Sequence, residues 1–234
     1  MTRGDVIKDS DIVFEEGRAL RREMNFHIEH KSYSIILIYT NRNNYKVGDD
    51  GRTVLHEGHN VQKTHNKTNL SEKYVDQPMK TPEGLLTENG KFYMAALDYK
   101  NKKTAVHKVK MYEKIKEGVW AYNGFFNLVD AYIENDGNRN VFKFKLEMIE
   151  DDLDAQETYD RIVQLNMEHN RLIPTDVKVA VYARDKGRCA KCGSYKNLHY
   201  DHIRPFSKGG SSTTVDNIQL LCAECNLKKH DHIE

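Results

Sequence analysis

The sequence predicts an α+β protein with a curved β-sheet or barrel in its first part and a small unit stapled by cysteines in its last part. Three observations lead to this prediction: strand-like segments crowd residues 33–150, a helical periodicity follows at 151–175, and all four cysteines lie between positions 189 and 225. A chain of 234 residues forms one large domain or two modest ones. We divide it into residues 1–150, a helical linker at 151–175 and a second domain at 176–234.

The composition is that of a globular protein with a polar surface, with 38% apolar and 30% charged residues. The longest aliphatic run, residues 35–38, is far shorter than the ~20 residues that cross a bilayer. Residues 1–11 contain no apolar stretch of the secretory kind. We therefore expect a cytoplasmic protein without a membrane partner. The net charge is only +1, so any nucleic-acid binding must come from local sites.

The first part of the chain is predicted to hold one helix followed by strands. Residues 14–30 are helix-like, and Ser34–Tyr39 is typical of a buried strand. Residues 49–51 and 57–58 are turn signals, and residues 141–148 alternate apolar and polar side chains with a period of two. Further strands are expected at 91–96, 105–112, 118–122 and 125–132. Many short strands between Gly and Asn turns favour a curved sheet or barrel.

A helical connector is predicted over residues 151–175. Tyr159, Val163 and Met167 recur at i, i+4 and i+8, which places them on one helix face. Pro174 ends this pattern. The connector would separate the strand-rich part from the cysteine-containing part.

Two CxxC pairs, Cys189–Cys192 and Cys222–Cys225, favour a metal site over four buried free thiols. Each pair presents two thiolates from one knuckle, and four thiolates complete a tetrahedral zinc shell with no open position. In a reducing compartment such pairs hold metal more often than they form disulfides. We predict one structural Zn²⁺.

The residues around the second cysteine pair form an ordered set: Asp201-His202, Gly209-Gly210, Asn217, and Asn226 directly after Cys225. In order and spacing, residues 179–230 resemble the HNH nuclease family, whose fold is a ββα-metal unit. The resemblance implies a DNA endonuclease that uses one divalent cation. It also implies that Asn217 braces the loop that orients His202, and that Asn226 is a metal ligand.

Phosphodiester hydrolysis requires an activated water and a cation at the leaving oxygen. His202 is the candidate general base because imidazole titrates near neutral pH. On a strand its side chain points away from that of Asp201, which leaves Asp201 free to hold the metal. His230 follows Asn226 at i+4 and is a candidate third ligand. Oxygen ligands favour Mg²⁺ or Mn²⁺, and an imidazole broadens the choice to Ni²⁺ or Zn²⁺.

Several other polar residues of this segment have two readings. The cationic side chains either contact phosphates or form an ordinary solvated face; they are Arg204, Lys208, Lys228 and Lys229. His199 either contacts DNA or is an ordinary strand residue.

A second set of motifs runs through residues 30–152. Its landmarks are Tyr45, Asp49-Asp-Gly51, His56-Glu-Gly-His59, Asp76-Gln77, Asn89-Gly90, Tyr122-Asn-Gly124 and residues 141–146. In order and spacing they resemble the SRA (YDG) domain, a crescent-shaped β-barrel that flips a modified cytosine out of duplex DNA. SRA followed by HNH is an arrangement of modification-dependent restriction endonucleases.

The SRA resemblance implies a base pocket. Tyr45 would stack on the flipped base, His56 stands where the family has a second aromatic residue, and Asp49, with Asp50 as a rival, would read the cytosine edge. Tyr122-Asn-Gly124 is expected to be a structural turn between strands. The plainer alternatives are that Tyr45 is a core residue, that residues 49–51 are only a hairpin turn, and that Trp120 packs rather than stacks.

Together the two resemblances imply a type IV-like endonuclease of bacterial or archaeal type that restricts foreign double-stranded DNA carrying 5-methylcytosine or 5-hydroxymethylcytosine. One HNH site attacks one strand, so we expect a homodimer for double-strand breaks. Two alternatives remain: an HNH nicking, homing-type or weakly specific nuclease that ignores modification, and a non-catalytic zinc module that binds DNA.

Overall fold

The predicted α+β class is confirmed by a computed structural model that describes residues 1–27, 31–39, 44–61, 71–149, 172–205 and 208–229. The elements of the first part are β1 (Val6–Lys8), α1 (Asp9–Glu16), β2 (Met24–Asn25), β3 (Ser34–Tyr39), β4 (Tyr45–Val47), β5 (Thr53–Glu57), η1 (Glu72–Tyr74), α2 (Glu88–Lys100), β6 (His107–Lys116), β7 (Val119–Asn135) and β8 (Asn140–Met148). Those of the second part are α4 (Thr175–Arg184), β9 (Leu198–His202), η3 (Val215–Asn217), β10 (Ile218–Cys222) and α5 (Ala223–Lys229).

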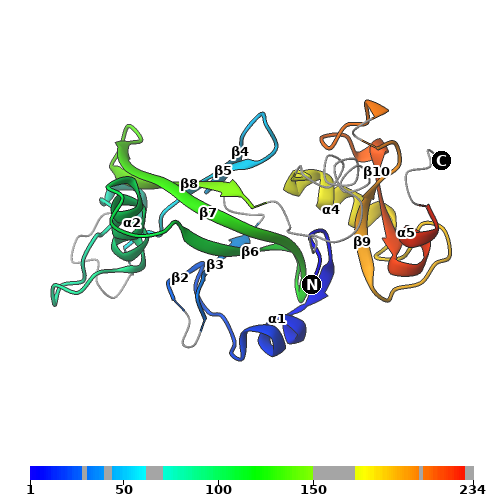
Figure 1. The fold of residues 1–234 in the computed structure, drawn as a ribbon, viewed down its shortest axis with the longest axis horizontal. Coiled ribbons are helices and arrows are strands. Elements are labelled where there is room, and N and C mark those ends of the chain that lie inside the picture. The colour runs from blue at the N-terminus through cyan, green and yellow to red at the C-terminus, as the bar shows by residue number, and fades with distance from the viewer. Residues whose placement is uncertain (28–30, 40–43, 62–70, 150–171, 206–207, 230–234) are drawn as a thin grey trace.

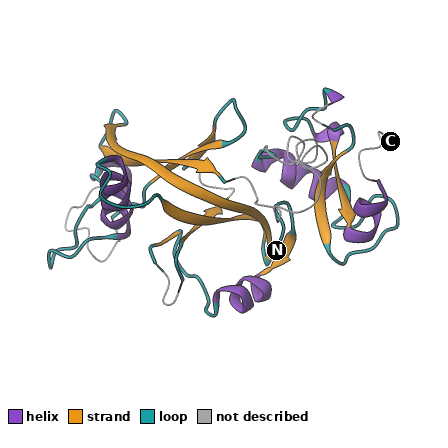
Figure 2. Ribbon diagram, in the orientation of Figure 1, coloured by secondary structure: helices purple, strands orange, loops and turns teal. Residues whose placement is uncertain are grey.

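The first part is a sheet of eight described strands. Seven of them follow the order β2-β3-β6-β7-β8-β5-β4, and the eighth, β1, pairs with β7. All pairs are antiparallel except β3 with β6. The sheet bends along the long strand β7, as Figures 1 and 2 show. Among the described strands, β2 and β4 stand at the two ends of this path.

The main core lies between this sheet and α2, where Phe92 and Ala96 of the helix are buried against the sheet. The strand predicted at 91–96 is therefore wrong. The Thr87 side chain caps the helix by accepting a hydrogen bond from the Gly90 backbone N–H. Phe92 and Ala96 stand at i and i+4, which is a helical spacing.

The helix predicted at 14–30 is also wrong in its position. Helix α1 covers Asp9–Glu16 and ends at Gly17, which adopts a left-handed conformation with φ of 71°. The chain then pairs as β2 with β3. Residues 28–30 lie outside the described part of the chain.

The motif Tyr122-Asn-Gly124 lies inside the continuous strand β7, not in a turn between two strands. A register shift interrupts the pairing of β6 with β7 between Met111 and Tyr112. Gly124 has φ of 89°, and the Arg3 guanidinium lies 2.8 Å from where its Cβ would stand. A side chain at position 124 would therefore displace Arg3.

The second part joins the antiparallel hairpin β9–β10 to α4 and α5, with the β-β-α order that the sequence predicts. Pro174 stands immediately before α4, so it starts a helix here. The connector helix predicted at 151–175 falls mostly on residues 150–171, which lie outside the described part. No helix among the described residues is long and apolar enough to span a membrane.

The two parts share one hydrophobic core. Ile115 of β6 and Ala121 of β7 pack with Val181 of α4 and Leu220 of β10. Residues 4 and 5 lie between the two sheets, because Gly4 N–H donates to Tyr122 O and Gly4 O accepts from Tyr200 N–H. Figure 1 shows the N-terminal end of the chain between the end of β7 and strand β9.

Candidate functional site

The four cysteines come together as the sequence predicts. Their Sγ atoms all lie within 4.8 Å of one another, and Cys192 Sγ is 3.6 Å from Cys222 Sγ. Zinc with four sulfur ligands at about 2.3 Å needs sulfur–sulfur separations of about 3.8 Å. All four cysteines are free thiols. The set therefore fits one tetrahedral, closed zinc site, and it is the one group of three or more His, Cys, Asp or Glu side chains among the described residues that could hold a metal.

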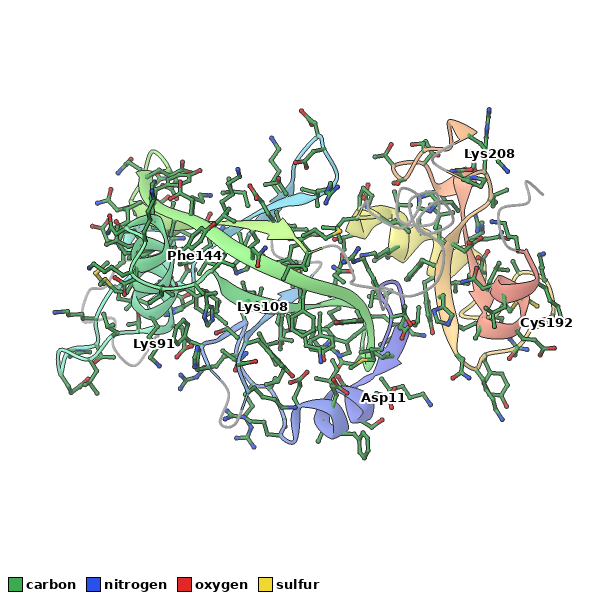
Figure 3. All side chains as sticks on the ribbon, in the orientation of Figure 1. Asp11, Lys91, Lys108, Phe144, Cys192 and Lys208 are labelled. Carbon is green, nitrogen blue, oxygen red and sulfur yellow. The ribbon has the colours of Figure 1, made fainter. Side chains whose placement is uncertain are left out.

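The knuckles shift the cysteine pKa values in opposite directions: the pKa of Cys189 is lowered, whereas hydrogen bonds among the neighbouring thiols raise the pKa of Cys192 and Cys225. Burial raises the pKa of Cys189, but backbone N–H groups of both knuckles outweigh it and lower that pKa to about 6. Cys225 N–H also points to Cys222 Sγ at 3.5 Å. Figure 3 labels Cys192 beside α5. A zinc ion held by these four cysteines would tie the knuckle before β9 to the start of α5.

Asp201 lies on β9, directly opposite Gln219 of β10. Its Oδ2 accepts hydrogen bonds from Lys229 Nζ at 2.8 Å and from Gln219 Nε2 at 3.2 Å. Lys229 also donates to the His202 carbonyl, and only 3% of it is exposed. Lys229 is thus part of the Asp201 site, not of a solvated face.

His202 ends β9, and its Nε2 lies 2.9 Å from the hydroxyl of the buried Ser212. His202 is half-buried. The contact with Ser212 fixes the ring orientation, as a positioned base requires.

Asn217 joins both ends of the loop that follows His202. Its Oδ1 accepts from Arg204 N–H at 2.9 Å, and its Nδ2 donates to Arg204 O at 3.0 Å and to Ser211 O at 2.9 Å. The Asn217 carbonyl also accepts from Ile203 N–H at 2.7 Å. Three side-chain hydrogen bonds therefore hold this loop closed beside His202.

Asn226 is half-buried on α5 and stands three residues before Lys229, so both lie on the helix face turned toward β9. Asp201 and Asn226 carry oxygen donors of the kind that Mg²⁺ or Mn²⁺ prefers. In this structure Asp201 Oδ2 is paired with Lys229 Nζ. His230, the predicted third ligand, lies outside the described residues.

The predicted base-pocket residues are brought together only in part. Tyr45 of β4 and His56 of β5 are direct cross-strand neighbours. The Tyr45 hydroxyl donates to Glu113 Oε1 at 3.2 Å, and burial together with Glu113 raises the pKa of this phenol. Tyr45 also packs against the main core, in agreement with the plainer reading of this residue.

His56 is completely buried, and neither ring nitrogen has a hydrogen-bond partner. Burial, with a smaller contribution from Lys143, lowers its pKa to about 3. The ring is therefore neutral at pH 7, with one unpaired donor and one unpaired acceptor. Such an orphaned polar group is the feature expected of a site that pairs with a ligand.

Asp49 and Asp50 lie in the exposed turn between β4 and β5. Asp50 accepts hydrogen bonds from Arg52 N–H, Thr53 N–H and Thr53 Oγ1, and these lower its pKa to about 2. Asp50 is therefore a turn residue. Asp49 is four residues from Tyr45 along the hairpin, roughly 13 Å at strand spacing.

The other predicted side chains have clear places. His199 Nδ1 lies 2.6 Å from Asp5 Oδ1, so it contacts the N-terminal segment. Trp120 packs as the plainer alternative states, with its Nε1 donating to Asp9. Arg204, Lys208 and Lys228 are exposed, and Figure 3 shows Lys208 projecting outward. The contacts of Ser212, Gln219 and Lys229 with His202 and Asp201 were not predicted from the sequence. The i, i+3 spacing of Asn226 and Lys229 indicates that these two residues share a helix face.

One segment of the second part is similar to a known protein family. Residues 187–232 match the family model described as HNH endonuclease. This region contains all four cysteines, Asp201, His202, Asn217 and Asn226. No curated protein matches the chain.

Solved structures similar to this chain include KRYPTONITE in complex with mCHG DNA, with 15% identity and a TM-score of 0.43 over 68% of this chain and 34% of that one. The SUVH5 SRA complex with methylated CHH DNA has 19% identity and a TM-score of 0.42 over 64% of this chain and 89% of that one. SUVH5 SRA bound to hydroxymethylated CG DNA has 18% identity and a TM-score of 0.40 over 61% and 84%. The segment 187–232 of this chain is therefore similar to the HNH endonuclease family model.

Proposed function

We propose that this chain is a metal-dependent DNA endonuclease whose C-terminal part hydrolyses phosphodiester bonds. The observation that carries the proposal is the joint placement of Asp201, His202 and Asn217 on one zinc-stapled hairpin, inside the segment that matches the HNH model. A non-catalytic zinc module would not need a buried Ser212 holding the His202 ring.

In this mechanism His202 takes the proton of the attacking water while Ser212 and the Asn217-braced loop keep the imidazole in place. Asp201 and Asn226 would hold Mg²⁺ or Mn²⁺, which supplies positive charge at the leaving oxygen. Lys229 pairs with Asp201 and holds the carboxylate in place. The zinc site keeps β9 and α5 in register.

We propose further that the first part selects DNA carrying 5-methylcytosine or 5-hydroxymethylcytosine by base flipping, with Tyr45 and His56 at the base. The support is the motif order of residues 30–152 and the unpaired imidazole of His56. A buried imidazole that lacks partners gains two hydrogen bonds from a base edge. Asp49, in its exposed turn, is a weaker candidate for the base-reading carboxylate.

The strength of discrimination can be bounded. Burying one methyl group contributes about 0.8 kcal/mol, or about fourfold in affinity, whereas flipping a base costs a few kcal/mol. Methyl burial alone therefore discriminates weakly. Strong selectivity requires shape rejection, a hydrogen bond to a hydroxymethyl group, or two readers in a homodimer. The biological role would be restriction of modified foreign DNA in a bacterial or archaeal cytoplasm.

The test is a digest of matched duplexes that carry unmodified, 5-methyl, 5-hydroxymethyl or glucosylated cytosine, with Mg²⁺ or Mn²⁺. We expect cleavage of a modified duplex and little cleavage of the unmodified one. His202→Ala should bind modified DNA and fail to cut it. Equal cutting of all duplexes would favour an HNH nuclease that ignores modification, which the exposed position of Asp49 also favours.

A further inference from the structure

A buried polar cluster joins the two parts of the molecule. Lys178 Nζ of α4 lies 2.5 Å from Glu113 Oε2 of β6 and 2.7 Å from Asn123 Oδ1 of β7. Asn123 Nδ2 donates to the same Glu113 oxygen at 2.9 Å. Glu113, Asn123 and Lys178 are 1%, 4% and 3% exposed, so the cluster is closed to water.

The Glu113–Lys178 ion pair is charged despite its burial. Burial raises the pKa of Glu113, but Lys178 outweighs it and holds that pKa below its ordinary value. A buried pair of this kind is costly to break on one side and demands a specific geometry. It therefore specifies one placement of α4 on the sheet, which apolar packing alone does less well.

Helix α4 is in turn bound to the nuclease hairpin. Arg184 donates to Val215 O at 2.8 Å and to Ile218 O at 2.7 Å. Tyr200 Oη donates to Lys178 O at 3.0 Å, and Leu220 N–H donates to Asp185 Oδ2 at 2.8 Å. Whatever orients α4 therefore orients β9, which carries Asp201 and His202, and β10, which directly follows Asn217.

The cluster also reaches the predicted base pocket. Tyr45 donates to Glu113 Oε1, the oxygen that Lys178 does not use. One carboxylate thus contacts a pocket residue with one oxygen and the nuclease helix with the other. Modules joined by a linker move relative to each other unless their interface holds them.

We propose that Glu113, Asn123 and Lys178 are positioning residues that hold the nuclease part in one orientation on the sheet. Resting on the proposed function, this predicts that the chain cuts at a narrow set of phosphates at a fixed distance from the modified base. None of the three residues touches the candidate reacting groups.

The experiment uses Glu113→Gln/Lys178→Met, which removes both charges together, so that no unpaired ion is left in the interior. Cut positions are mapped on duplexes with a single modified cytosine. In parallel, backbone residual dipolar couplings compare the alignment of the two parts of the intact chain. We expect loss of the dominant cut position and two alignment tensors where the unsubstituted chain has one.

Lys110→Met/Glu16→Gln is the matched control, because Lys110 is equally buried at 3% and pairs with the buried Glu16 inside the first part, so both charges are again removed together. It should keep the focused pattern and the single tensor. A single tensor in the double variant would overturn the inference, whether or not that variant cuts. If the unsubstituted chain cuts without regard to the modified base, the proposed function fails, while the tensors still decide the orientation.

Discussion

His56 is a fully buried residue whose two ring nitrogens have no hydrogen-bond partner. Its imidazole is enclosed between β4 and β8, where its cross-strand neighbours are Tyr45 and Phe144, and it forms no hydrogen bond. An apolar side chain of similar size would remove this penalty. The retention of an unpaired donor and acceptor in the sheet therefore favours a role in binding over a role in packing.

We expect His56→Phe to raise the free energy of unfolding at pH 7 by about 1 kcal/mol, because it removes an unsatisfied buried group. The same variant should bind modified DNA more weakly. Urea unfolding and a DNA-binding titration check the two effects. A destabilised variant with normal binding would assign His56 to the core alone.

His56 also predicts a pH dependence of stability. The unfolded imidazole binds a proton below its ordinary pKa of 6.5, whereas the folded one binds it only near pH 3. Stability therefore falls as the pH drops through this window, by about 2 kcal/mol from this residue between pH 7 and pH 5. In His56→Phe this part of the decrease should disappear, leaving the share of groups such as His107, whose pKa is lowered to about 4. An unchanged slope would contradict the assignment.

At the scale of elements, two sets of interactions of different chemistry stabilise the β9–β10 hairpin. The zinc site holds the first knuckle to the start of α5, and Asn217 holds the loop between β9 and β10. Neither device draws on a large core, since the hairpin has only five residues in each strand.

Removing zinc should unfold the hairpin and α5 while the eight-stranded sheet remains. Structural zinc contributes on the order of 10 kcal/mol, comparable to the whole stability of a small domain. Elemental analysis should find one zinc per chain, and a chelator should abolish cleavage and amide protection in β9 and β10. A purified active protein without zinc would rule out this site.

Asn217→Ala should open the loop after His202 without releasing zinc. It removes three hydrogen bonds worth about 1 kcal/mol each, and cleavage should fall at least about tenfold, since a displaced base loses most of its catalytic effect. Thr213→Ala, which loses only an exposed contact with Ser211, is the control. Equal activity in both variants would show that the loop needs no brace.

Much of the element pattern was readable from sequence, and the failures have physical causes. Period-two alternation located β8, and the aliphatic run located β3. The strand expected at 91–96 is wrong because Phe92 and Ala96 lie on one face of a helix as well as on one face of a strand. Only the packing against the sheet selects the helix. Gly17, which ends α1, is a residue type that commonly terminates helices and could have been used to place the helix end.

For the site, spacing located the cysteines, Asp201, His202 and Asn217, because these are close in sequence. Lys178, Glu113 and Ser212 could not be found in this way. Their partners are far along the chain or lie on another element, so no local pattern marks them.

At the scale of the whole molecule, the N-terminal segment links the two sheets. Gly4 bonds to Tyr122 of β7 on one side and to Tyr200 of β9 on the other, with φ of 92°. Arg3 adds bonds to the carbonyls of Asn123 and Ile149. The two parts therefore meet through shared backbone pairing as well as through the core.

Gly4→Pro should loosen this junction, because proline lacks the N–H that binds Tyr122 O and cannot adopt a positive φ. Amide exchange in β9 and in the first part of β7 should quicken. Gly84→Pro is the control, since it loses the Gly84 N–H bond to Thr81 O at a similar φ of 86° in a loop remote from the junction. Equal protection of β9 in both variants would contradict the role of the segment.

The position of Gly4 has a consequence for synthesis on the ribosome. Gly4 precedes both partners in the chain, so its hydrogen bonds to Tyr122 and Tyr200 can form only after those residues have been synthesised. A polypeptide released early, before position 200, would lack one side of this junction together with the second cysteine pair. The Gly4 junction and the cysteine set are therefore completed only after residues 200–225 have been synthesised.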